Sequence, residues 1–518
     1  MKTVTLDKSS AKEKFLPVIE PLLWFALLFL YTYTAYTSFG YDDEYFNIRI
    51  VTENNLKGMI HLTQTSDLHP PLSYIINYIL YQISGNWSLV RVASALFFLS
   101  TLYFTSRKIE DIFPRLLTIV LLGLNPTVLL WATGLRWYAY MLPLLLIWSD
   151  LPRNYKWYYW PKFFLLLFIV CYTGYAGFFL AVPYFIYYWL SDKRPFLDKL
   201  KSIFIPGFVF AAAYAWQLYI FFTVHSKINL NDDSNKQVFN LKTSLSSLLS
   251  SAASNQGVFP VSWSGLCSIL GAVMVYTAMA MHFKKTWQQK QFILFFGTGF
   301  LFVLTGIAGK VRNLVLLEPA RAQLFASAIA SGKKWVLGGF FLVLIGNGAG
   351  IYHVVSHQQT TKNAWNIPVT KVLAELDKIE NSGNQEIYFT YHPSFTFYLL
   401  QSKKRLISFY NTLYFDSTRI PFTFNQLITE QASLKKNYTF ILTYAGQSIA
   451  DTVHRRMLAA MNTVIADSIS HLRIGRDDDF RLKQRFFPGF PEYAVEIVKY
   501  YGVRSFDTSR LSVWDKGR

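Results

Sequence analysis

The chain has 518 residues, of which 52% are hydrophobic and 18% aromatic, whereas only 16% carry a charge. A soluble protein of this length has more charged residues, so the composition predicts a polytopic membrane protein. The formal net charge of +19 does not indicate binding to nucleic acid, because the cations lie in short connections between apolar runs. The two cysteines, Cys171 and Cys267, lie within apolar runs and indicate neither a redox compartment nor a metal site.

Eleven apolar segments are predicted as transmembrane helices. The first has no small-residue cleavage site and leads into a chain that re-enters the membrane repeatedly, so it is not a cleaved signal peptide. In chain order, the segments are residues 20–39, 88–106, 115–132, 137–150, 162–173, 176–190, 202–223, 262–282, 291–308, 313–331 and 335–352.

Every second connection between these segments is rich in lysine and arginine, starting with the N-terminus. This alternation predicts that those connections and the N-terminus are cytoplasmic. Residues 72–83 are also apolar, but a run of about a dozen residues is too short to span a bilayer. A crossing here would also reverse the side of every later loop. We therefore expect this run to form a helix that lies on, or dips into, the outer leaflet.

Residues 353–518 follow the last apolar segment and are predicted to form a soluble domain outside the membrane. The stretches EIYFTY, KRLISFY and NYTFILTYAG are typical of strands, and TKVLAELDKI and SFTFYLLQS are typical of helices. The sequence thus predicts a helical membrane module over residues 1–352 and a small extracytoplasmic α/β domain over residues 353–518.

The first outer connection, residues 40–87, carries the largest group of polar residues in the membrane module. It opens with YDDEYFNIRI and closes with SDLHPPLSY, whose two prolines suit the first turn of a helix. Between these ends we expect a surface helix with Tyr45, Ile48 and Val51 on one side. The polar side chains that could carry chemistry are Asp42, Asp43, Glu44, Asp67 and His69.

Three arginines, Arg91, Arg136 and Arg312, lie near the outer ends of apolar segments. A charge at bilayer depth costs about 2.5–3.5 kcal/mol on insertion scales, so each arginine is expected to have a partner. Phosphate is a natural partner for a planar guanidinium group. Carboxylates outside the membrane and arginines at its surface therefore suggest a lipid-phosphate ligand beside an acid–base site.

Together with SLVRVASALFFLSTLYF, LNPTVLLWATGLRWYAYMLPLLL and VRNLVLLEPARAQLFASA, these motifs resemble the GT-C glycosyltransferases. More narrowly, they are similar to the bacterial family-39-like and protein-mannosyltransferase-like group. That group carries an Asp-Glu pair in the first outer loop, an Asp-x-His-Pro-Pro-Leu stretch and an Arg-x-Tyr after the third span. The resemblance covers about residues 20–330. It implies an inverting transfer of a sugar from polyprenyl phosphate to a hydroxyl group on the outer face of the membrane.

Carried over by motif, Asp43 matches the general-base aspartate, Glu44 matches its neighbour, and Asp67 and His69 match the second motif. A carboxylate is well suited to removing the proton of an acceptor hydroxyl. This chain has Asp-Asp-Glu, so Asp42 competes with Asp43 for the role of base. Glu44 could instead only favour the start of the surface helix, and Asp67 could only cap the helix that follows it.

The Arg-x-Tyr motif falls on Arg136 and Tyr138, and the resemblance implies that Arg136 lies near the lipid phosphate. Arg91 and Arg312 are further candidates for substrate binding, although the sequence at Arg312 reads Val-Arg-Asn where many relatives have Arg-Tyr. A phosphate leaving group needs charge stabilisation, which arginines or a metal supply. No cofactor is assigned, and a divalent metal stays open. The candidate metal ligands are Glu44, Asp67 and His69.

The sequence thus predicts a multi-pass protein of the bacterial inner membrane, with its N-terminus cytoplasmic and its C-terminal domain periplasmic. Its predicted activity is hexosyl or pentosyl transfer from a polyprenyl-phosphate sugar to a glycan, a glycolipid or a protein. One alternative is a glycan polymerase or ligase that uses a lipid-diphosphate donor. Another is a transporter or flippase for a polyprenyl-linked sugar, in which ionisable groups near the bilayer midplane are expected. A pocket midway through the helix bundle, rather than at its outer end, would favour the transporter.

Overall fold

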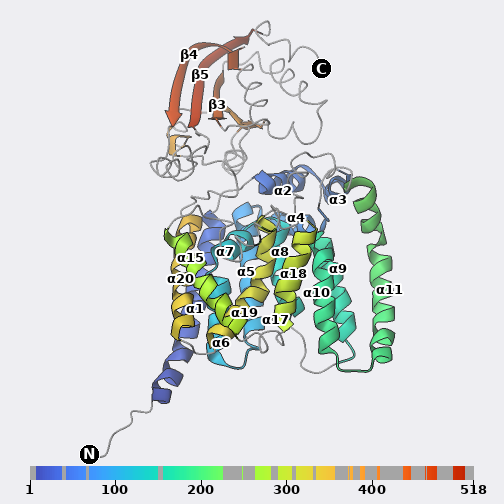
Figure 1. Cartoon of the computed structure of the whole chain (residues 1–518). Helices are drawn as coiled ribbons and strands as arrows, with labels where there is room; N and C mark the ends of the chain where they lie inside the picture. The colour runs from blue at the N-terminus through green and yellow to red at the C-terminus, as the bar shows by residue number, and fades with distance from the viewer. Residues whose placement is uncertain are drawn as a thin grey trace, which may run out of the picture. The chain divides into compact units, whose positions relative to one another are not determined.

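The structure is a computed structural model of the chain, which divides into two compact units (Figure 1). One unit comprises Met1–Ser38 and Asn47–Gln358, and the other comprises Phe39–Phe46 and Gln359–Arg518. The structure describes residues 8–37, 42–65, 69–149, 156–225, 245, 248, 263–281, 290–305, 311–330, 334–355, 372, 374–376, 378, 386–390, 405–408, 436–444, 461–462, 464–474 and 494–507.

The first unit is built of helices, and every segment that the sequence predicts as transmembrane overlaps one of them. This confirms the helical membrane fold. The described helices, in chain order, are α1 (Lys8–Thr37), α2 (Asp42–Glu53), α3 (Leu56–Thr65), α4 (Leu72–Ser84), α5 (Trp87–Ser106), α6 (Ile112–Gly123), α7 (Pro126–Ala132), α8 (Trp137–Ser149), α9 (Tyr159–Thr173), α10 (Ala176–Ser191), α11 (Phe196–Ile220), η1 (Phe221–His225), α15 (Trp263–Met281), α17 (Lys290–Phe292), η2 (Ile293–Gly297), α18 (Thr298–Leu304), η4 (Val311–Leu317), α19 (Glu318–Ala330) and α20 (Lys334–Val355).

Four described helical stretches are long and apolar enough to cross a membrane, judged by length and composition. They are Val18–Thr37, Trp87–Ser106, Phe196–Thr223 and Lys334–Tyr352. The bent pair α6–α7 makes a fifth if it counts as one span, and the other apolar helices of the described chain are shorter. The predicted segments therefore all contain helix, but within the described residues fewer than half of them have the full length of a span.

The third predicted segment, residues 115–132, is a bent pair of helices rather than one straight helix. Helices α6 and α7 meet at an angle of 65°. The break occurs at Asn125, whose side-chain Oδ1 accepts hydrogen bonds from the backbone N–H groups of Thr127 (2.9 Å) and Val128 (3.1 Å). Asn125 is thus the N-cap of α7, and Pro126 follows at a position where a helix needs no backbone donor.

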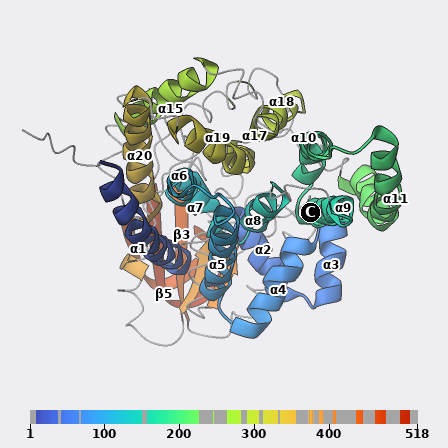
Figure 2. The ribbon, with the colours of Figure 1, turned by 90° about the horizontal axis from the view of Figure 1, so that it is seen from below.

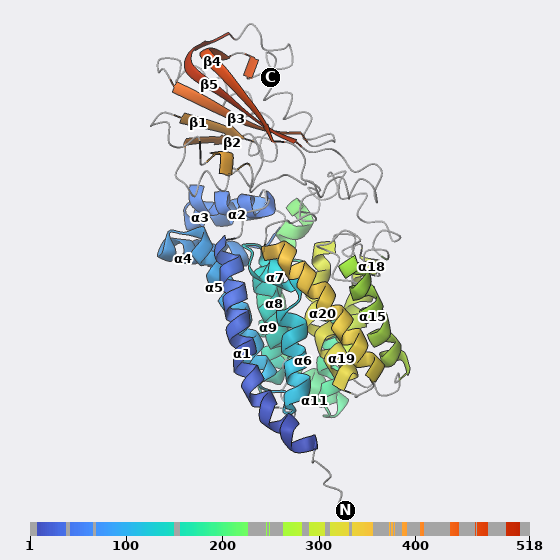
Figure 3. The same cartoon turned by 90° about the vertical axis from the view of Figure 1, so that its left-hand side faces the viewer.

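The helices of the first unit pack in groups that Figure 2 shows from one end. Helices α15, α19 and α20 lie together, and α9 contacts both α10 and α11. Figure 3 shows α1 beside α6, with which it is in contact. Helix α11 has an outer face of large apolar side chains, including Phe204 (74% exposed) and Phe208 (69%), as expected of a surface that faces lipid.

Short helices α3 and α4 lie at the end of the bundle opposite the amino end of α1 (Figures 1 and 3). Helix α4 covers the apolar run that was predicted as a helix, and it is amphipathic. Tyr74 and Asn77 are buried, whereas Ile79 is 51% and Ile83 79% exposed. The expected helix after the acid cluster is also present as α2, with Ile48 and Val51 each 1% exposed. The side chain of Tyr45 lies outside the described part.

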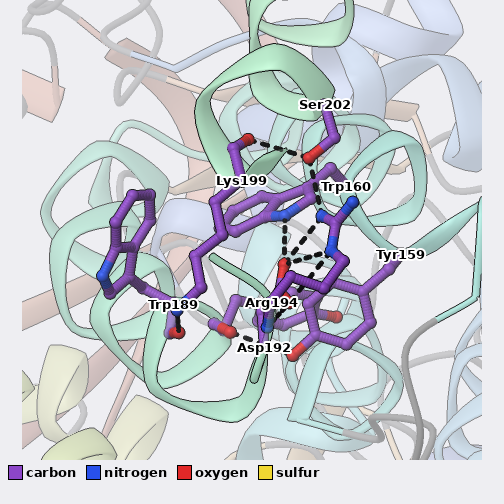
Figure 4. Close-up of polar contacts among 8 residues, drawn as sticks. Tyr159, Trp160, Trp189, Asp192, Arg194, Lys199 and Ser202 are labelled. Carbon is purple, nitrogen blue, oxygen red and sulfur yellow. Dashed lines mark hydrogen bonds and ion pairs between the residues drawn. The ribbon is translucent and has the colours of Figure 1, made fainter. Parts of the chain in front are cut away.

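A buried acid joins α9, α10 and α11 at the turn between α10 and α11 (Figure 4). The carboxylate of Asp192 accepts hydrogen bonds from the Arg194 guanidinium (2.8 Å to Nη2) and from Trp160 Nε1 (3.0 Å). Arg194 also donates to Ser202 Oγ at 2.7 Å. Burial opposes the ionisation of Asp192, but the hydrogen bonds and the charge of Arg194 outweigh it and lower the pKa of the carboxyl group below its ordinary value.

The second unit contains a five-stranded sheet with the order β2-β1-β3-β5-β4. Strand β1 pairs in parallel with β2 and β3, whereas β5 pairs antiparallel with β3 and β4. The three predicted strands are confirmed as β1 to β3, and described residues of TKVLAELDKI are helical. The stretch SFTFYLLQS lies outside the described part. The strands are β1 (Glu386–Thr390), β2 (Arg405–Ser408), β3 (Lys436–Tyr444), β4 (Val464–Ile474) and β5 (Ala494–Phe506).

Candidate functional site

The turn between α7 and α8 carries Arg136 and is fixed by two buried asparagines from other helices. Asn47 of α2 and Asn77 of α4 both donate from Nδ2 to the backbone carbonyl of Leu135, at 2.9 and 2.7 Å. Asn77 also donates to Asn47 Oδ1 at 3.2 Å. Both asparagines are almost fully buried. A buried polar side chain is costly unless it is hydrogen-bonded, so these bonds hold α2, α4 and the turn in one arrangement.

The same network continues into α5 and α8. Tyr140 donates to Asn77 Oδ1 at 2.5 Å, and Ser94 donates to the Tyr140 hydroxyl at 3.1 Å. Ser94, Asn77 and Tyr140 are all buried. Four helices and one turn are thus joined by a continuous chain of hydrogen bonds, and networks of this kind favour a single packing of the elements that they join.

Arg136 contacts a tyrosine hydroxyl, and the residue that follows it belongs to a group of aromatic rings. Its Nη1 donates to the hydroxyl of Tyr74 on α4 at 3.4 Å, and the residue is 6% exposed. The next residue, Trp137, stacks on Tyr138 with ring centroids 3.8 Å apart and lies 6.0 Å from the ring of His69. A planar guanidinium group is a suitable partner for a phosphate.

The start of α8, which carries Trp137 and Tyr138, is attached to η4. Tyr138 donates from its hydroxyl to Asn313 Oδ1 at 2.5 Å. Gly174, at the end of α9, leaves room for the Trp137 ring, because a Cβ at this position would lie 2.8 Å from the ring. Trp137 is therefore held between Gly174 on one side and Tyr138 on another.

The structure brings together three of the residues that the sequence predicts for the site: Arg136, Tyr138 and His69. Arg91 lies on α5, is fully buried and is 0% exposed. Glu44 is 1% exposed, so it is not a solvated surface acid.

The other predicted residues are described only in part or not at all. Asp42 and Asp43 form the start of α2, and Arg312 lies on η4, but their side chains are outside the described part. Asp67 also lies outside the described residues. Within the described residues, no group of three or more His, Cys, Asp or Glu side chains could hold a metal ion.

A second buried polar cluster lies among α6, α15, α19 and α20, where the sequence predicts no functional residue. Glu318 and Arg321, one helical turn apart on α19, form an ion pair with Nη2–Oε2 and Nε–Oε2 distances of 2.6 and 3.0 Å. Asn125 donates to the same Oε2 at 2.6 Å. The cluster borders a cavity of about 20 Å³, enough for a single water molecule. Its further polar lining residues are Ser268 and Asn347.

The polar partners in both clusters were missed because an isolated asparagine or serine in an apolar helix has no periodic signal. Glu318 and Arg321 did have a signal, since an acid and a base three residues apart in an apolar segment indicate a paired, buried function. Asn125 had another, because Asn-Pro is typical of a turn or of a helix start.

No family model matches the sequence, and no curated protein matches it. Among solved structures, the chain is similar to ArnT from Cupriavidus metallidurans bound to undecaprenyl phosphate. The identity is 11%, the match covers 94% of this chain and 98% of that chain, and the TM-score is 0.49. For the apo state of the same ArnT, the identity is 11%, the coverage is 95% and 98%, and the TM-score is 0.45. At 11% identity, the similarity says nothing about the substrate of this chain.

Proposed function

We propose that this protein is a membrane glycosyltransferase that moves one sugar from a polyprenyl-phosphate carrier to an acceptor hydroxyl group. The observation that carries the proposal is the bond between Asn47 and the carbonyl of Leu135. Asp43 stands one helical turn before Asn47 on α2, and Arg136 directly follows Leu135. The helix of the proposed base is therefore tied to the turn of the proposed phosphate-binding arginine.

In the proposed reaction, the Asp43 carboxylate accepts the proton of the acceptor hydroxyl as its oxygen attacks the anomeric carbon. A new carbon–oxygen bond forms while the bond from the anomeric carbon to the phosphate oxygen breaks, so the configuration inverts. The proton ends on Asp43, and polyprenyl phosphate leaves with the bonding electrons. Arg136 stabilises the negative charge that develops on the phosphate, and Tyr74 helps to hold its guanidinium group.

Trp137 is buried between Gly174 and Tyr138, so its ring supports the site from within. His69, whose ring lies 6.0 Å from that of Trp137, is the proposed polar contact of the sugar. The resemblance gives the classes of both substrates. The sugar is a hexose or a pentose, and the acceptor is a glycan, a glycolipid or a protein.

Transfer in proteoliposomes tests the proposal. The purified protein is given a labelled polyprenyl-phosphate sugar and a pool of candidate acceptors, and the wild type is compared with Asp43→Asn and Asp42→Asn. We expect near-complete loss of transfer in Asp43→Asn, with binding of the donor lipid retained. Asp42→Asn is the matched control, because it removes a neighbouring charge from the same turn. Loss of transfer in Asp42→Asn alone would assign the role of general base to Asp42.

A transporter of a polyprenyl-linked sugar is the second candidate, because the Glu318–Arg321 pair and the broken pair α6–α7 are features that transporters use. The cavity beside them, at about 20 Å³, is far too small for a sugar. Movement of the labelled lipid between leaflets, without turnover, would nevertheless favour the transporter over the transferase.

A further inference from the structure

Two hydrogen bonds connect the segment that carries Arg136 to a second segment far away in the sequence. At one end, Asn125 donates to Glu318 at 2.6 Å, and at the other end Tyr138 donates to Asn313 at 2.5 Å. The residue numbers rise along one segment and fall along the other, so residues 125–138 and 313–318 run antiparallel. We call this pair of bonds the two-point clamp.

Asn125 is suited to such a clamp because its side chain makes two kinds of bond at once. Its Oδ1 accepts from the first free N–H groups of α7, and its Nδ2 donates to the Glu318 carboxylate. The start of α7 is therefore attached directly to the start of α19. Helix α7 has only seven residues, and the turn with Arg136 follows it without further helix.

Glu318 is itself fixed, because Arg321 binds the same carboxylate oxygen through both Nε and Nη2. Glu318 is 5% exposed and Arg321 is 8% exposed. Arg321 also lies over the ring of Phe325, 5.7 Å from its centroid. A carboxylate held by a two-bond guanidinium contact has little freedom of rotation, so it is a firm anchor for Asn125.

We propose that Asn125, Glu318 and Asn313 are positioning residues for Arg136: the two-point clamp sets the place of the α7–α8 turn and thereby the affinity for the lipid phosphate. This rests on the proposed function, in which Arg136 binds that phosphate. Loss of the Asn125–Glu318 bond lets α7 shift, and the guanidinium group then meets the phosphate in a wider range of positions.

The substitution Asn125→Ser isolates the bond. Serine remains a good N-cap for α7, but it has no amide to donate to Glu318. The matched control is Trp160→Phe, which likewise removes one neutral N–H donor from a buried carboxylate that an arginine also binds. Asn313→Ala removes the other bond of the clamp and serves as the second test variant.

Binding of a polyprenyl phosphate to the full-length protein in nanodiscs is measured together with thermal unfolding. We expect Asn125→Ser and Asn313→Ala each to raise the Kd by about five- to tenfold, the range of one lost hydrogen bond. Trp160→Phe should lower the unfolding temperature without changing the Kd. If Asn125→Ser does not fold, Asn313→Ala carries the test.

A Kd within twofold of the wild type in both clamp variants would overturn the inference, and so would an equal rise in Trp160→Phe. If the wild type itself binds no polyprenyl phosphate, the proposed function fails first, so the two failures can be told apart.

Discussion

At the scale of single residues, the carbonyl oxygen of Leu135 is the point where the site is held together. It accepts from Asn47 and Asn77, which come from two different helices. Asn77 takes part in two further hydrogen bonds, because it also accepts from Tyr140 and donates to Asn47. The position of Arg136, one residue further along, therefore depends on side chains that do not touch the substrate in the proposed reaction.

The substitution Asn77→Ala should lower the free energy of unfolding by about 1–3 kcal/mol, because it leaves buried polar groups without a bond. Tyr140→Phe removes only one of the hydrogen bonds and should lower the free energy of unfolding by a smaller amount. Thermal unfolding in detergent measures both. Equal stability of Asn77→Ala and the wild type would show that the network contributes nothing to folding.

The substitution Arg136→Lys tests the role of the guanidinium group itself. Lysine keeps the charge but loses the planar fork that binds two phosphate oxygens at once. We expect the Kd for polyprenyl phosphate to rise about tenfold in Arg136→Lys and further in Arg136→Gln. Unchanged binding in both variants would contradict the assignment of Arg136 to the lipid phosphate.

At the scale of helices and turns, glycine decides how closely α15 and α20 approach. A Cβ added at Gly271 would lie 2.4 Å from the backbone oxygen of Gly339. Backbone atoms cannot move aside as a flexible side chain can, so no larger residue fits at position 271 without a shift of the helices. Small residues at a helix crossing are a general device for close packing in membranes.

The substitution Gly271→Ala should therefore destabilise the protein by about 1–3 kcal/mol, the usual cost of overpacking. Gly348→Ala on α20 is the matched control, because a Cβ there meets nothing within 4 Å. The control should be neutral or slightly stabilising, since alanine favours a helix more than glycine does. The unfolding temperatures of the two variants are measured side by side. If Gly348→Ala lowers the unfolding temperature as much as Gly271→Ala does, close packing at Gly271 is not the cause.

The lowered pKa of Asp192, in the turn between α10 and α11, predicts that the stability of the protein depends on pH. The pKa of Asp192 is lower in the folded protein than in the unfolded chain. Its contribution to stability is therefore fully present above the ordinary carboxyl pKa, about 3.9, and is lost as the pH falls through the lowered value. Between pH 6 and pH 3, the wild type should lose more stability than Asp192→Asn, as measured by thermal unfolding. Parallel pH curves for the two proteins would contradict this.

At the scale of the whole molecule, long apolar runs were sufficient to predict helix in each of the eleven segments. The break at Asn125 was missed because the residues on both sides of it are apolar. Strands β1 to β3 could be predicted from runs of aromatic and branched residues. Strand β4 could not, because VIADSISHLRI mixes polar and apolar residues without a steady period of two.

The candidate site was predictable only in the residues that belong to a sequence motif. Motif spacing identified Arg136, Tyr138 and His69, which the structure brings close together. It could not identify Asn47 or Asn77, because their importance comes from contacts with Leu135, which lies 88 and 58 positions further along the sequence. Such contacts are set by tertiary packing and leave no local pattern.

A transfer reaction with the purified wild-type protein in proteoliposomes, in which both products are identified, tests whether this protein is a glycosyltransferase. We expect that a polyprenyl-phosphate sugar is consumed, that polyprenyl phosphate appears in equal amount, and that the anomeric configuration of the transferred sugar is inverted. Retention of configuration would contradict the proposed single displacement by the acceptor hydroxyl group, with Asp43 as its base. Movement of the intact donor between leaflets, without any transfer, would contradict the transferase itself.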